Sequence, residues 1–349
     1  MFLDELLQQA LQEVVRGVPE AASLLARFPE GVWVADTSSI TLPKAFAAVW
    51  AGTDGDDAAG VKVAARWNVQ HGQLQLWLGP GRVHDQHTGV NATALAAGSV
   101  WLGDLGFFNL ETFAAYQAQG VDFFSRYKGG TSVWTAAGQP LNLADYLAHT
   151  APHSLDCPVL LGAERLPCRL LAFPVPLTVQ RQRQARLRET ARRKQQPVSP
   201  LAGALSGWTI YITSLAPDQL SAHEALTLGM TRWQIECLFK LWKSSGLLDE
   251  WRSADPLRIW VEFYGKLLAL LVQHWLTLVS AWQRLDRSLY RAAQVIRKHA
   301  FHLATVLRDA LALEQVLMHL AQTILHTCGM SKRNAHPLTF QYWLALVTA

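Results

Sequence analysis

Short apolar runs with the composition of β-strands fill the first part of the chain. Residues 31–36 read GVWVAD, which is typical of a buried strand that ends on an acid. Residues 61–69 and 73–79 are rich in β-branched and aromatic side chains and flank a turn-like His-Gly pair, a pattern that predicts a β-hairpin. Residues 99–104 read SVWLGD and predict another such strand. The sequence thus predicts two strands that each end on a carboxylate, Asp36 and Asp104.

Helical patterns lie on both sides of these strands. The first 15 residues are amphipathic, and residues 107–120 predict a helix that is followed by a strand over 121–128. From 129 to 217 the pattern changes to short strands with Gly and Pro between them, interrupted by a basic run and closing on GWTIYITS. We therefore expect a β-rich region in the middle of the chain.

A long helix is predicted to follow the β-rich region. Ser221 and Glu224 stand in the spacing of a capping box, so we expect a helix to begin there and to continue through TRWQIECLFKLWK, residues 231–243. Everything beyond Asp255 also has a helical pattern. The chain is therefore predicted to be α/β, with a helical C-terminal region.

The composition is that of a folded protein without membrane-spanning segments. Of the 349 residues, 50% are hydrophobic and 17% are charged, which allows a large core and excludes wholesale disorder. The longest apolar stretch, 267–282, is interrupted by Gln273 and His274 and is shorter than the roughly 20 apolar residues that span a bilayer. The N-terminus lacks the basic segment of a signal peptide. We expect a cytoplasmic protein whose four cysteines are reduced thiols.

Positive charge is concentrated in one run. The net charge is +4, yet residues 181–194 (RQRQARLRETARRK) contain seven basic residues against the single acid Glu189. One interpretation of this run is a solvated surface segment, and the other is a contact for a polyphosphate partner. Composition alone does not separate the two.

Glu236 stands among three cations on the helix predicted over 231–243. Arg232 lies four residues before it, and Lys240 and Lys243 lie four and seven residues after it, so we expect them to share its helical face. One interpretation is a ladder of salt bridges on a solvated face. The other is a carboxylate that works beside cations that hold phosphates.

The two strand-end aspartates offer partners for this carboxylate. If the strands that carry Asp36 and Asp104 are parallel neighbours, their ends lie about 4.8 Å apart and both carboxylates aim at one point. Hard divalent cations such as Mg²⁺ prefer oxygen ligands, and two ions roughly 3.5 to 4 Å apart can stabilise both oxygens of a phosphodiester displacement. Glu236 would complete such a site from a helix packed on the same sheet.

Several motifs, in this order, resemble those of a known family. VWVADTSSITLP contains Asp36, GDLGFFNLETF contains Asp104 and is followed by FFSRYK, and RWQIECLFKLWK contains Glu236. Arg232, Glu236 and Lys243 match in register the last three residues of the signature Y-(2)-R-(3)-E-(6)-K. GPGRVHD and LLDEWRSADPLRIWVEFYGKLLALLVQHWL look like linking and post-signature segments. The chain therefore resembles the DDE insertion-sequence transposases, specifically the insertion-sequence-four group of bacterial cut-and-paste enzymes.

The resemblance implies a fold and a chemistry. The implied fold is a ribonuclease-H-like mixed sheet flanked by helices, with a β-rich insertion before the last catalytic helix and a helical C-terminal region. Asp36, Asp104 and Glu236 would bind two Mg²⁺ ions, for which Mn²⁺ can substitute. Water and then a DNA 3′-hydroxyl would attack phosphodiesters there, with a hairpin intermediate. The implied partners are double-stranded DNA, as transposon ends and target, and a second copy of the chain in a homodimer on DNA at the nucleoid.

The resemblance also implies six DNA-binding residues, namely Arg126, Lys128, Trp208, Arg232, Lys240 and Lys243. In related enzymes a tryptophan of the insertion stacks on a flipped base, a contact worth roughly 1 to 3 kcal/mol. Trp208 matches that residue, although a tryptophan that opens a strand is more often part of the core. His84 and Asp85 look like a metal pair only in isolation, and we interpret them as structural.

With the resemblance, the chain divides into five expected regions. They are an N-terminal helical segment (1–30), the first part of the ribonuclease-H-like domain (31–130), the β-strand insertion with the basic run (131–217), the catalytic helix (218–262) and the helical C-terminal region (263–349). The first of these can be interpreted as the remnant of a DNA-recognition domain, since about 35 residues precede Asp36.

One departure from the signature bears on activity. The tyrosine position is Gly229, which we expect to leave an empty place beside the site and to weaken the enzyme.

Two alternative functions remain beside that of a transposase. A weakened or domesticated DNA-binding protein would need no metal, which the intact Asp36, Asp104 and Glu236 argue against. A simple metal-dependent nuclease would share the site but lack strand transfer.

Overall fold

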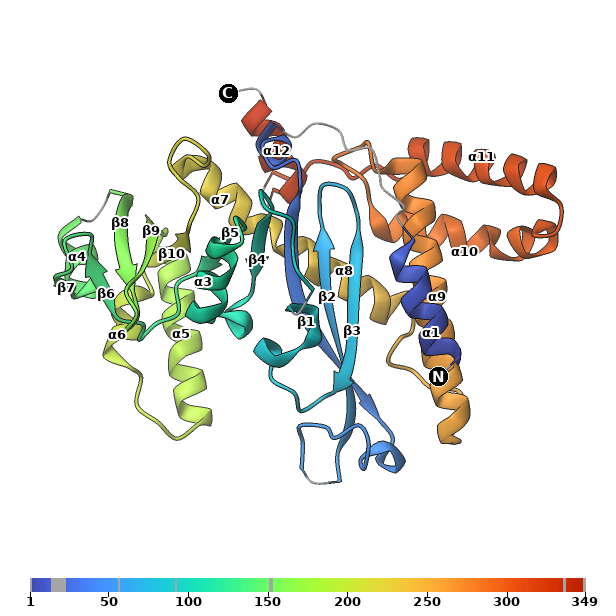
Figure 1. Cartoon of the computed structure of the whole chain (residues 1–349), viewed down its shortest axis with the longest axis horizontal. Coiled ribbons are helices and arrows are strands. Elements are labelled where there is room, and N and C mark those ends of the chain that lie inside the picture. Colours follow the sequence, from blue (N-terminus) through green and yellow to red (C-terminus); the bar gives the residue numbers. More distant parts are fainter. Residues whose placement is uncertain are drawn as a thin grey trace. The chain divides into compact units, whose positions relative to one another are not determined.

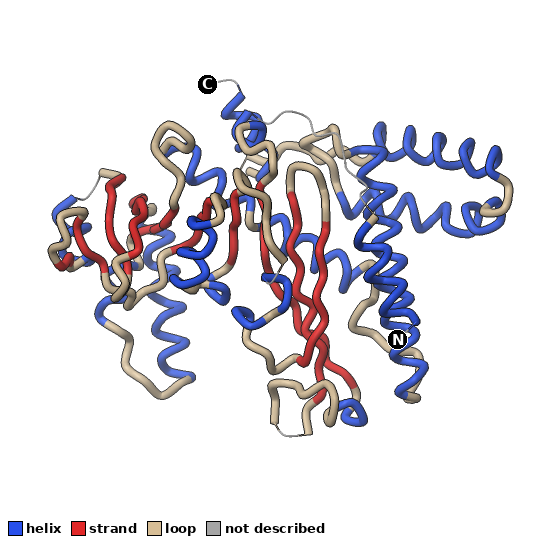
Figure 2. Tube along the Cα trace, in the orientation of Figure 1, coloured by secondary structure: helices blue, strands red, loops and turns tan. Residues whose placement is uncertain are grey.

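The structure is a computed structural model that describes residues 2–13, 23–55, 57–91, 93–150, 153–334 and 337–347. It is a mixed α/β chain, with parallel and antiparallel strand pairs flanked by helices (Figures 1 and 2). The chain divides into two compact units, the first made of Met1–Ala94 with Met230–Ala349 and the second of Leu95–Gly229. The expected class, a mixed sheet flanked by helices, is confirmed at this level.

The strands described in the first unit pair in antiparallel fashion. They are β1 (Val32–Leu42), β2 (Ala59–Asn68) and β3 (Leu74–Pro80), in the order β3-β2-β1. Every residue of β2 is buried, which is the burial expected of a central strand covered on both faces. The predicted hairpin is confirmed as β2 and β3.

Strand β1 does not end at Asp36, and that prediction was wrong. The strand continues to Leu42, and its second half pairs with the first half of β2. The polar run that follows Asp36 resembles a loop in the sequence. However, Ile40 and Leu42 resume the apolar alternation, and both are buried. Asp36 therefore lies inside a strand, with ladder pairs before and after it.

Helices make up the rest of the first unit. They are α1 (Phe2–Gln12), α2 (Ser23–Ala26), α8 (Trp233–Ser244), α9 (Pro256–Ala281), α10 (Leu289–Val306), α11 (Ala310–Thr327) and α12 (Thr339–Val347). The helices predicted beyond Asp255 are confirmed, and the Asp255 carboxylate caps α9 by accepting from Arg258 N at 2.9 Å. Figure 1 shows α10 and α11 as an antiparallel hairpin, and α1 packs along α9.

The second unit combines a parallel β-α-β start with an antiparallel remainder. Its strands are β4 (Val100–Gly103), β5 (Asp122–Arg126), β6 (Val133–Thr135), β7 (Pro140–Leu141), β8 (Leu155–Leu161), β9 (Leu166–Pro174) and β10 (Trp208–Thr213), in the order β4-β5-β10-β9-β8-β6-β7. Its helices are α3 (Leu110–Ala118), α4 (Leu143–Thr150), α5 (Leu177–Arg193) and α6 (Pro200–Leu205). Only β4 and β5 pair in parallel among the described strands of this unit, because α3 supplies the crossover that such a pair needs.

An aromatic core holds this β-α-β start together. Phe113 of α3 stacks on Phe123 of β5, with ring centroids 4.4 Å apart and an interplanar angle of 8°. Trp101 of β4 lies 5.7 Å from Phe113 and is fully buried. The strands and the helix predicted over 99–128 are therefore confirmed, and their packing fixes the end of β4.

The helix predicted to begin at Ser221 begins there but is divided in two. The capping box is formed, since Ser221 N donates to Glu224 Oε2 at 2.9 Å and Glu224 N donates to Ser221 Oγ at 3.3 Å. The first piece is α7 (Ala222–Thr231), and α8 begins after Arg232, which lies between the two helices. The boundary between the two units falls inside α7.

Two expectations from composition concern the whole chain. None of the helices in the described ranges is long and apolar enough to cross a membrane. All four cysteines are free thiols, and Cys328 is the most deeply buried of them.

Candidate active site

Asp36 and Glu236 meet at one guanidinium. Arg232 Nη2 lies 2.5 Å from Glu236 Oε1, and Arg232 Nη1 lies 3.9 Å from Asp36 Oδ2. The side chains of Asp36, Arg232 and Glu236 are 17%, 18% and 25% exposed, so solvent reaches the cluster. The first unit therefore brings two of the three predicted carboxylates together at the arginine of the signature.

The backbone around each carboxylate explains its position. Asp36 lies opposite Ala65 of β2, and the N–H of Thr37 donates to Asp36 Oδ1 at 2.8 Å. Glu236 is in the first turn of α8, where the helix dipole favours a negative charge. The helix packs on β1 through its buried side, which consists of Ile235, Leu238, Phe239, Leu241 and Trp242.

The two lysines of the signature helix diverge. Lys243 Nζ donates to the backbone carbonyl of Ser39 at 3.0 Å, which ties the end of α8 to β1. Lys240 Nζ lies 4.0 Å from the ring centroid of Trp233, a cation–π contact. The structure thus places Lys243 at the strand that carries Asp36, whereas Lys240 turns toward the aromatic side of the helix.

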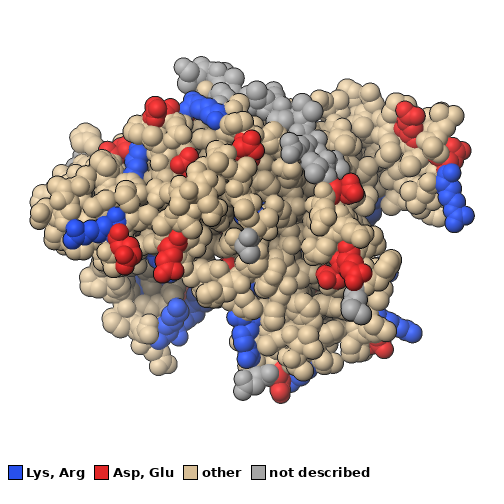
Figure 3. Space-filling model, viewed as in Figure 1, with Lys and Arg blue, Asp and Glu red and all other residues tan. Residues whose placement is uncertain are grey.

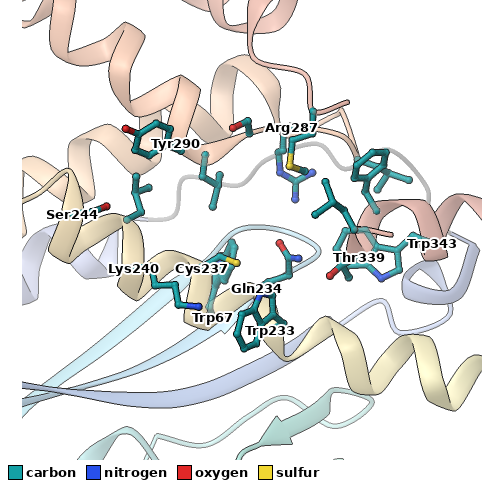
Figure 4. Close-up of a pocket in the computed structure, with 17 residues that line it drawn as sticks. Trp67, Trp233, Gln234, Cys237, Lys240, Ser244, Arg287, Tyr290, Thr339 and Trp343 are labelled. Atoms are coloured by element: carbon teal, nitrogen blue, oxygen red, sulfur yellow. The ribbon is translucent and has the colours of Figure 1, made fainter. Parts of the chain in front are cut away.

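The aromatic side of α8 borders a cavity of about 320 Å³ (Figure 4). Trp233, Cys237 and Lys240 of α8 face Tyr290 and Trp343 across it. Burial raises the pKa of the Cys237 thiol, so this cysteine is held as a neutral thiol. The cavity and the carboxylate pair therefore occupy different sides of one helix.

Asp104 belongs to the second unit, where it follows β4 directly, as the sequence predicts. Its backbone is extended, and it precedes the short 3₁₀ turn Leu105–Phe107 without forming a side-chain cap. In the ranges that the structure describes, no group of three or more His, Cys, Asp or Glu side chains is arranged to hold a metal ion. The carboxylates that the structure joins at one cation are Asp36 and Glu236.

Trp208 opens β10 and is half-buried. The guanidinium of Arg183, on α5, donates to the Trp208 carbonyl at 2.6 Å and to Thr209 Oγ1 at 2.9 Å. Burial, and then the nearby charge of Arg126, lowers the pKa of Arg183. Arg126 is exposed on β5, and Lys128 Nζ lies 5.9 Å from the Phe108 ring centroid. The second unit thus gathers three cations, Arg126, Lys128 and Arg183, on the elements around Trp208.

The basic run forms helix α5, which sequence periodicity did not indicate. None of its residues is buried, and Arg186, Arg188, Arg192 and Arg193 are exposed. Figure 3 shows Lys and Arg side chains over this helix. Arg183 attaches α5 to β10, so the remaining arginines stand on an ordered, solvent-facing helix.

The place expected to be empty beside Gly229 is filled. A Cβ atom at Gly229 would lie 2.4 Å from Tyr211 Oη and 2.5 Å from Tyr211 Cζ. Tyr211 is anchored on β10, where its ring packs on Phe124 with centroids 4.8 Å apart. The expectation of a gap was wrong, because the glycine lets α7 approach the tyrosine of a neighbouring strand.

Asp85 has a defined partner set, in keeping with the structural role expected of it. Its Oδ1 accepts from Lys62 Nζ at 2.8 Å and from Thr37 Oγ1 at 2.9 Å. His84 Nδ1 accepts from Gln86 N at 3.3 Å and so caps the following turn. Sequence reasoning missed Lys62, although a lysine inside the apolar run VKVAA is a signal, because a buried cation needs a partner.

Comparison with known proteins gives a consistent result. The family model described as a transposase DDE domain matches residues 27–272. The transposase for insertion sequence element IS231F of Bacillus thuringiensis subsp. israelensis is 22% identical, over 96% of this chain and 75% of its own length. The transposase for insertion sequence element IS231C of Bacillus thuringiensis subsp. berliner is 25% identical, over 68% of this chain and 55% of its own length.

A third relative matches a shorter segment. The putative transposase InsL for insertion sequence element IS186A of Escherichia coli (strain K12) is 33% identical, over 30% of this chain and 29% of its own length. The alignments thus span about three quarters of the first relative but only about half of the second.

Proposed function

The chain belongs to the family of transposase DDE domains, and on this premise we propose that it cleaves and joins DNA with divalent metal ions. The proposed ligands are Asp36 and Glu236 of the first unit and Asp104 of the second. One observation supports the proposal most directly: Arg232 lies 2.5 Å from Glu236 and 3.9 Å from Asp36, so two carboxylates face one cation. Two neighbouring carboxylates that solvent reaches are the kind of oxygen ligands that Mg²⁺ prefers.

The donor set fits a hard divalent ion. Asp36 and Glu236 offer carboxylate oxygens, which Mg²⁺ and Mn²⁺ prefer. Cys237 follows Glu236 in the sequence but borders the cavity on the aromatic side of α8, so its thiol is not part of the cluster. An oxygen-only set favours Mg²⁺ or Mn²⁺ over zinc, which takes nitrogen and sulfur ligands.

The side chains around the carboxylates have separate roles in this proposal. Bound there, divalent ions would lower the pKa of the attacking water and stabilise charge on the phosphodiester oxygens. Arg232 balances the two carboxylates and is placed to contact a phosphate, for which its planar guanidinium is suited. Lys243 ties α8 to β1 at the Ser39 carbonyl, on the strand that carries Asp36, and would also contact DNA there.

The second unit supplies most of the proposed DNA contacts. Arg126, Lys128 and the exposed arginines of α5 would bind phosphates, and Trp208 would stack on an unpaired base during hairpin formation. Lys240, which lies over Trp233, would contact DNA from the aromatic side of α8. The proposal also includes a ribonuclease-H-like core, the insertion over 131–217 and a homodimer on two DNA ends.

The test is cleavage of duplexes that carry the cognate terminal sequences, with Mg²⁺ or Mn²⁺. Asp36→Asn, Asp104→Asn and Glu236→Gln should each reduce cleavage by at least about 100-fold, because the charge that binds the ions is lost. DNA binding should stay nearly unchanged, because the phosphate contacts remain. Glu314→Gln is the matched control, since Glu314 is an exposed acid of α11.

The products distinguish the alternatives. Nicks, hairpins and joined strands together support a transposase. Nicks without joined strands would indicate a simple nuclease. DNA binding without metal-dependent cleavage in the parent chain would contradict the catalytic proposal and favour a DNA-binding derivative. An amide variant that cleaves like the parent would remove that residue from the site.

A further inference from the structure

A buried lysine marks the face of β1 opposite Asp36. Lys62 is 9% exposed, and its ammonium group donates to Asp85 Oδ1 at 2.8 Å. A buried ammonium group is stable only when a carboxylate or several acceptors balance it. Asp85 therefore has a fixed charge partner, and its carboxylate cannot rotate freely.

The same carboxylate oxygen holds a second group, on β1. Thr37 Oγ1 donates to Asp85 Oδ1 at 2.9 Å. The Thr37 and Asp36 side chains leave β1 on opposite faces, because successive side chains of a strand alternate. Asp85 thus binds β1 on the face that does not carry the Asp36 carboxylate.

Thr37 connects the two faces. Its backbone N–H donates to Asp36 Oδ1 at 2.8 Å, while its hydroxyl is bonded to Asp85. The Thr37 hydroxyl bond on the far face therefore adds to the ladder pairs with β2 in holding the peptide between Asp36 and Thr37. A carboxylate with one oxygen held in this way presents its other oxygen in a restricted direction, and Asp36 Oδ2 is the oxygen that faces Arg232.

We infer that Asp85 is a positioning residue for Asp36: fixed by Lys62, it holds Thr37 and thereby orients the carboxylate proposed to bind metal. This inference rests on the proposed function. It also gives Asp85 a role beyond its ion pair with Lys62. Partners of this kind commonly set the orientation of a metal ligand, and their loss costs about 10-fold to 100-fold in metal affinity.

The test measures Mn²⁺ binding to the full chain without DNA, by calorimetry, beside the thermal midpoint of unfolding. Thr37→Val removes the hydroxyl and keeps the shape and the backbone N–H. It should weaken Mn²⁺ binding by about 10-fold. Thr37→Ser restores the hydroxyl and should restore the affinity. Thr41→Val is the matched control, since Thr41 is an exposed threonine on the same face of β1, and it should change nothing.

A second variant covers the case in which Thr37→Val unfolds. Asp85→Asn keeps an oxygen that accepts from Thr37 and loses the charge that fixes Lys62, so it should weaken Mn²⁺ binding by less than about 10-fold. An Asp85→Asn variant that binds Mn²⁺ like the parent would contradict the positioning role. Each affinity is compared with that of Asp36→Asn, which defines the contribution of the Asp36 carboxylate.

The outcomes separate the inference from the proposed function. If Asp36→Asn weakens Mn²⁺ binding and Thr37→Val leaves it at the parent value, or Thr37→Ser fails to restore it, the positioning role is wrong and Asp85 serves only as the charge partner of Lys62. If the parent shows no Mn²⁺ binding that depends on Asp36, the proposed metal site is wrong, and the positioning role is wrong with it.

Discussion

The two units each contain an arginine paired with a carboxylate, and the two guanidinium groups differ in what else they contact. In the second unit, Arg169 donates to both Asp156 oxygens, at 2.6 and 2.5 Å, and to the Leu220 carbonyl at 2.6 Å. In the first unit, Arg232 contacts Glu236 with one nitrogen, and a second carboxylate lies 3.9 Å away. Arg169 is 8% exposed and bonds a backbone carbonyl as well as Asp156, whose side chain is 34% exposed, whereas Arg232 is shared by two carboxylates whose side chains are 17% and 25% exposed. A guanidinium that bonds one carboxylate and the backbone indicates a structural anchor, and one that two carboxylates share indicates a candidate site.

The largest expected effect is on the stability of the chain when Arg169 is replaced. Arg169→Met should lower the free energy of unfolding by about 2 kcal/mol, because it leaves the Leu220 carbonyl and the partly exposed Asp156 without their donor. Arg232→Met should lower it by about 1 kcal/mol or less, because its bond is to a partly exposed carboxylate, but should greatly reduce DNA cleavage. Chemical denaturation and a cleavage assay measure the two effects. The comparison fails if Arg232→Met destabilises the chain as much as Arg169→Met does.

An effect of similar or smaller size is expected at Gly229. Gly229→Ala places a Cβ atom 2.4 Å from Tyr211 Oη, so it should destabilise the chain by about 1 to 3 kcal/mol. Gly265→Ala is the matched control, because a Cβ at this helical glycine of α9 meets nothing within 4 Å. That change should stabilise the chain by about 0.5 to 1 kcal/mol. Thermal unfolding decides, and a stabilising Gly229→Ala would show that Tyr211 moves aside at little cost.

The clash with Tyr211 also determines the expected effect of Gly229→Tyr. The sequence alone suggests that this change would raise cleavage by filling a gap. With Tyr211 in the way, we expect it to lower both stability and cleavage. A Tyr variant with a higher cleavage rate and an unchanged unfolding midpoint would contradict this expectation.

The smallest expected effect is on salt dependence, and it distinguishes anchored from exposed arginines in the second unit. Replacing Arg186, Arg188, Arg192 and Arg193 with Gln should reduce the slope of log affinity for DNA against log salt by about 0.9 per lost phosphate contact. The control set is Arg258, Lys298 and Arg308, which are exposed cations of the first unit. Binding isotherms at several salt concentrations give the slope. An equal slope in parent and α5 variant would make α5 a solvated surface helix.

Patterns among residues close together in the sequence were sufficient to predict most helices and strands. Alternation in residues 61–79 predicts the β2-β3 hairpin, and the spacing of Ser221 and Glu224 predicts the start of α7. These features depend on neighbours in the sequence. The meeting of Asp36 and Glu236 joins segments far apart in the chain, so the residue pattern offered it only as one of two interpretations and the resemblance to a family favoured it.

Sequence reasoning missed three features for different physical reasons. The polar run after Asp36 resembles a loop, yet it is a strand because β2 pairs with it. Lys240 shares the Glu236 face by spacing, but the Trp233 ring attracts its ammonium group to another side. The basic run lacks apolar periodicity, so its helix was not visible in the pattern.

The contact between Gly229 and Tyr211 also limits the mutational history of this chain. With Tyr211 on β10, a single substitution that puts tyrosine at 229 places its Cβ atom 2.4 Å from Tyr211 Oη, which is a steric clash. Removing Tyr211 first would leave a void beside Phe124 and Phe173, which is also costly. Each single step is unfavourable and only the double change is open, a case of sign epistasis. A chain with glycine at 229 and tyrosine at 211 therefore acquires the tyrosine of the signature at least cost when both residues change together.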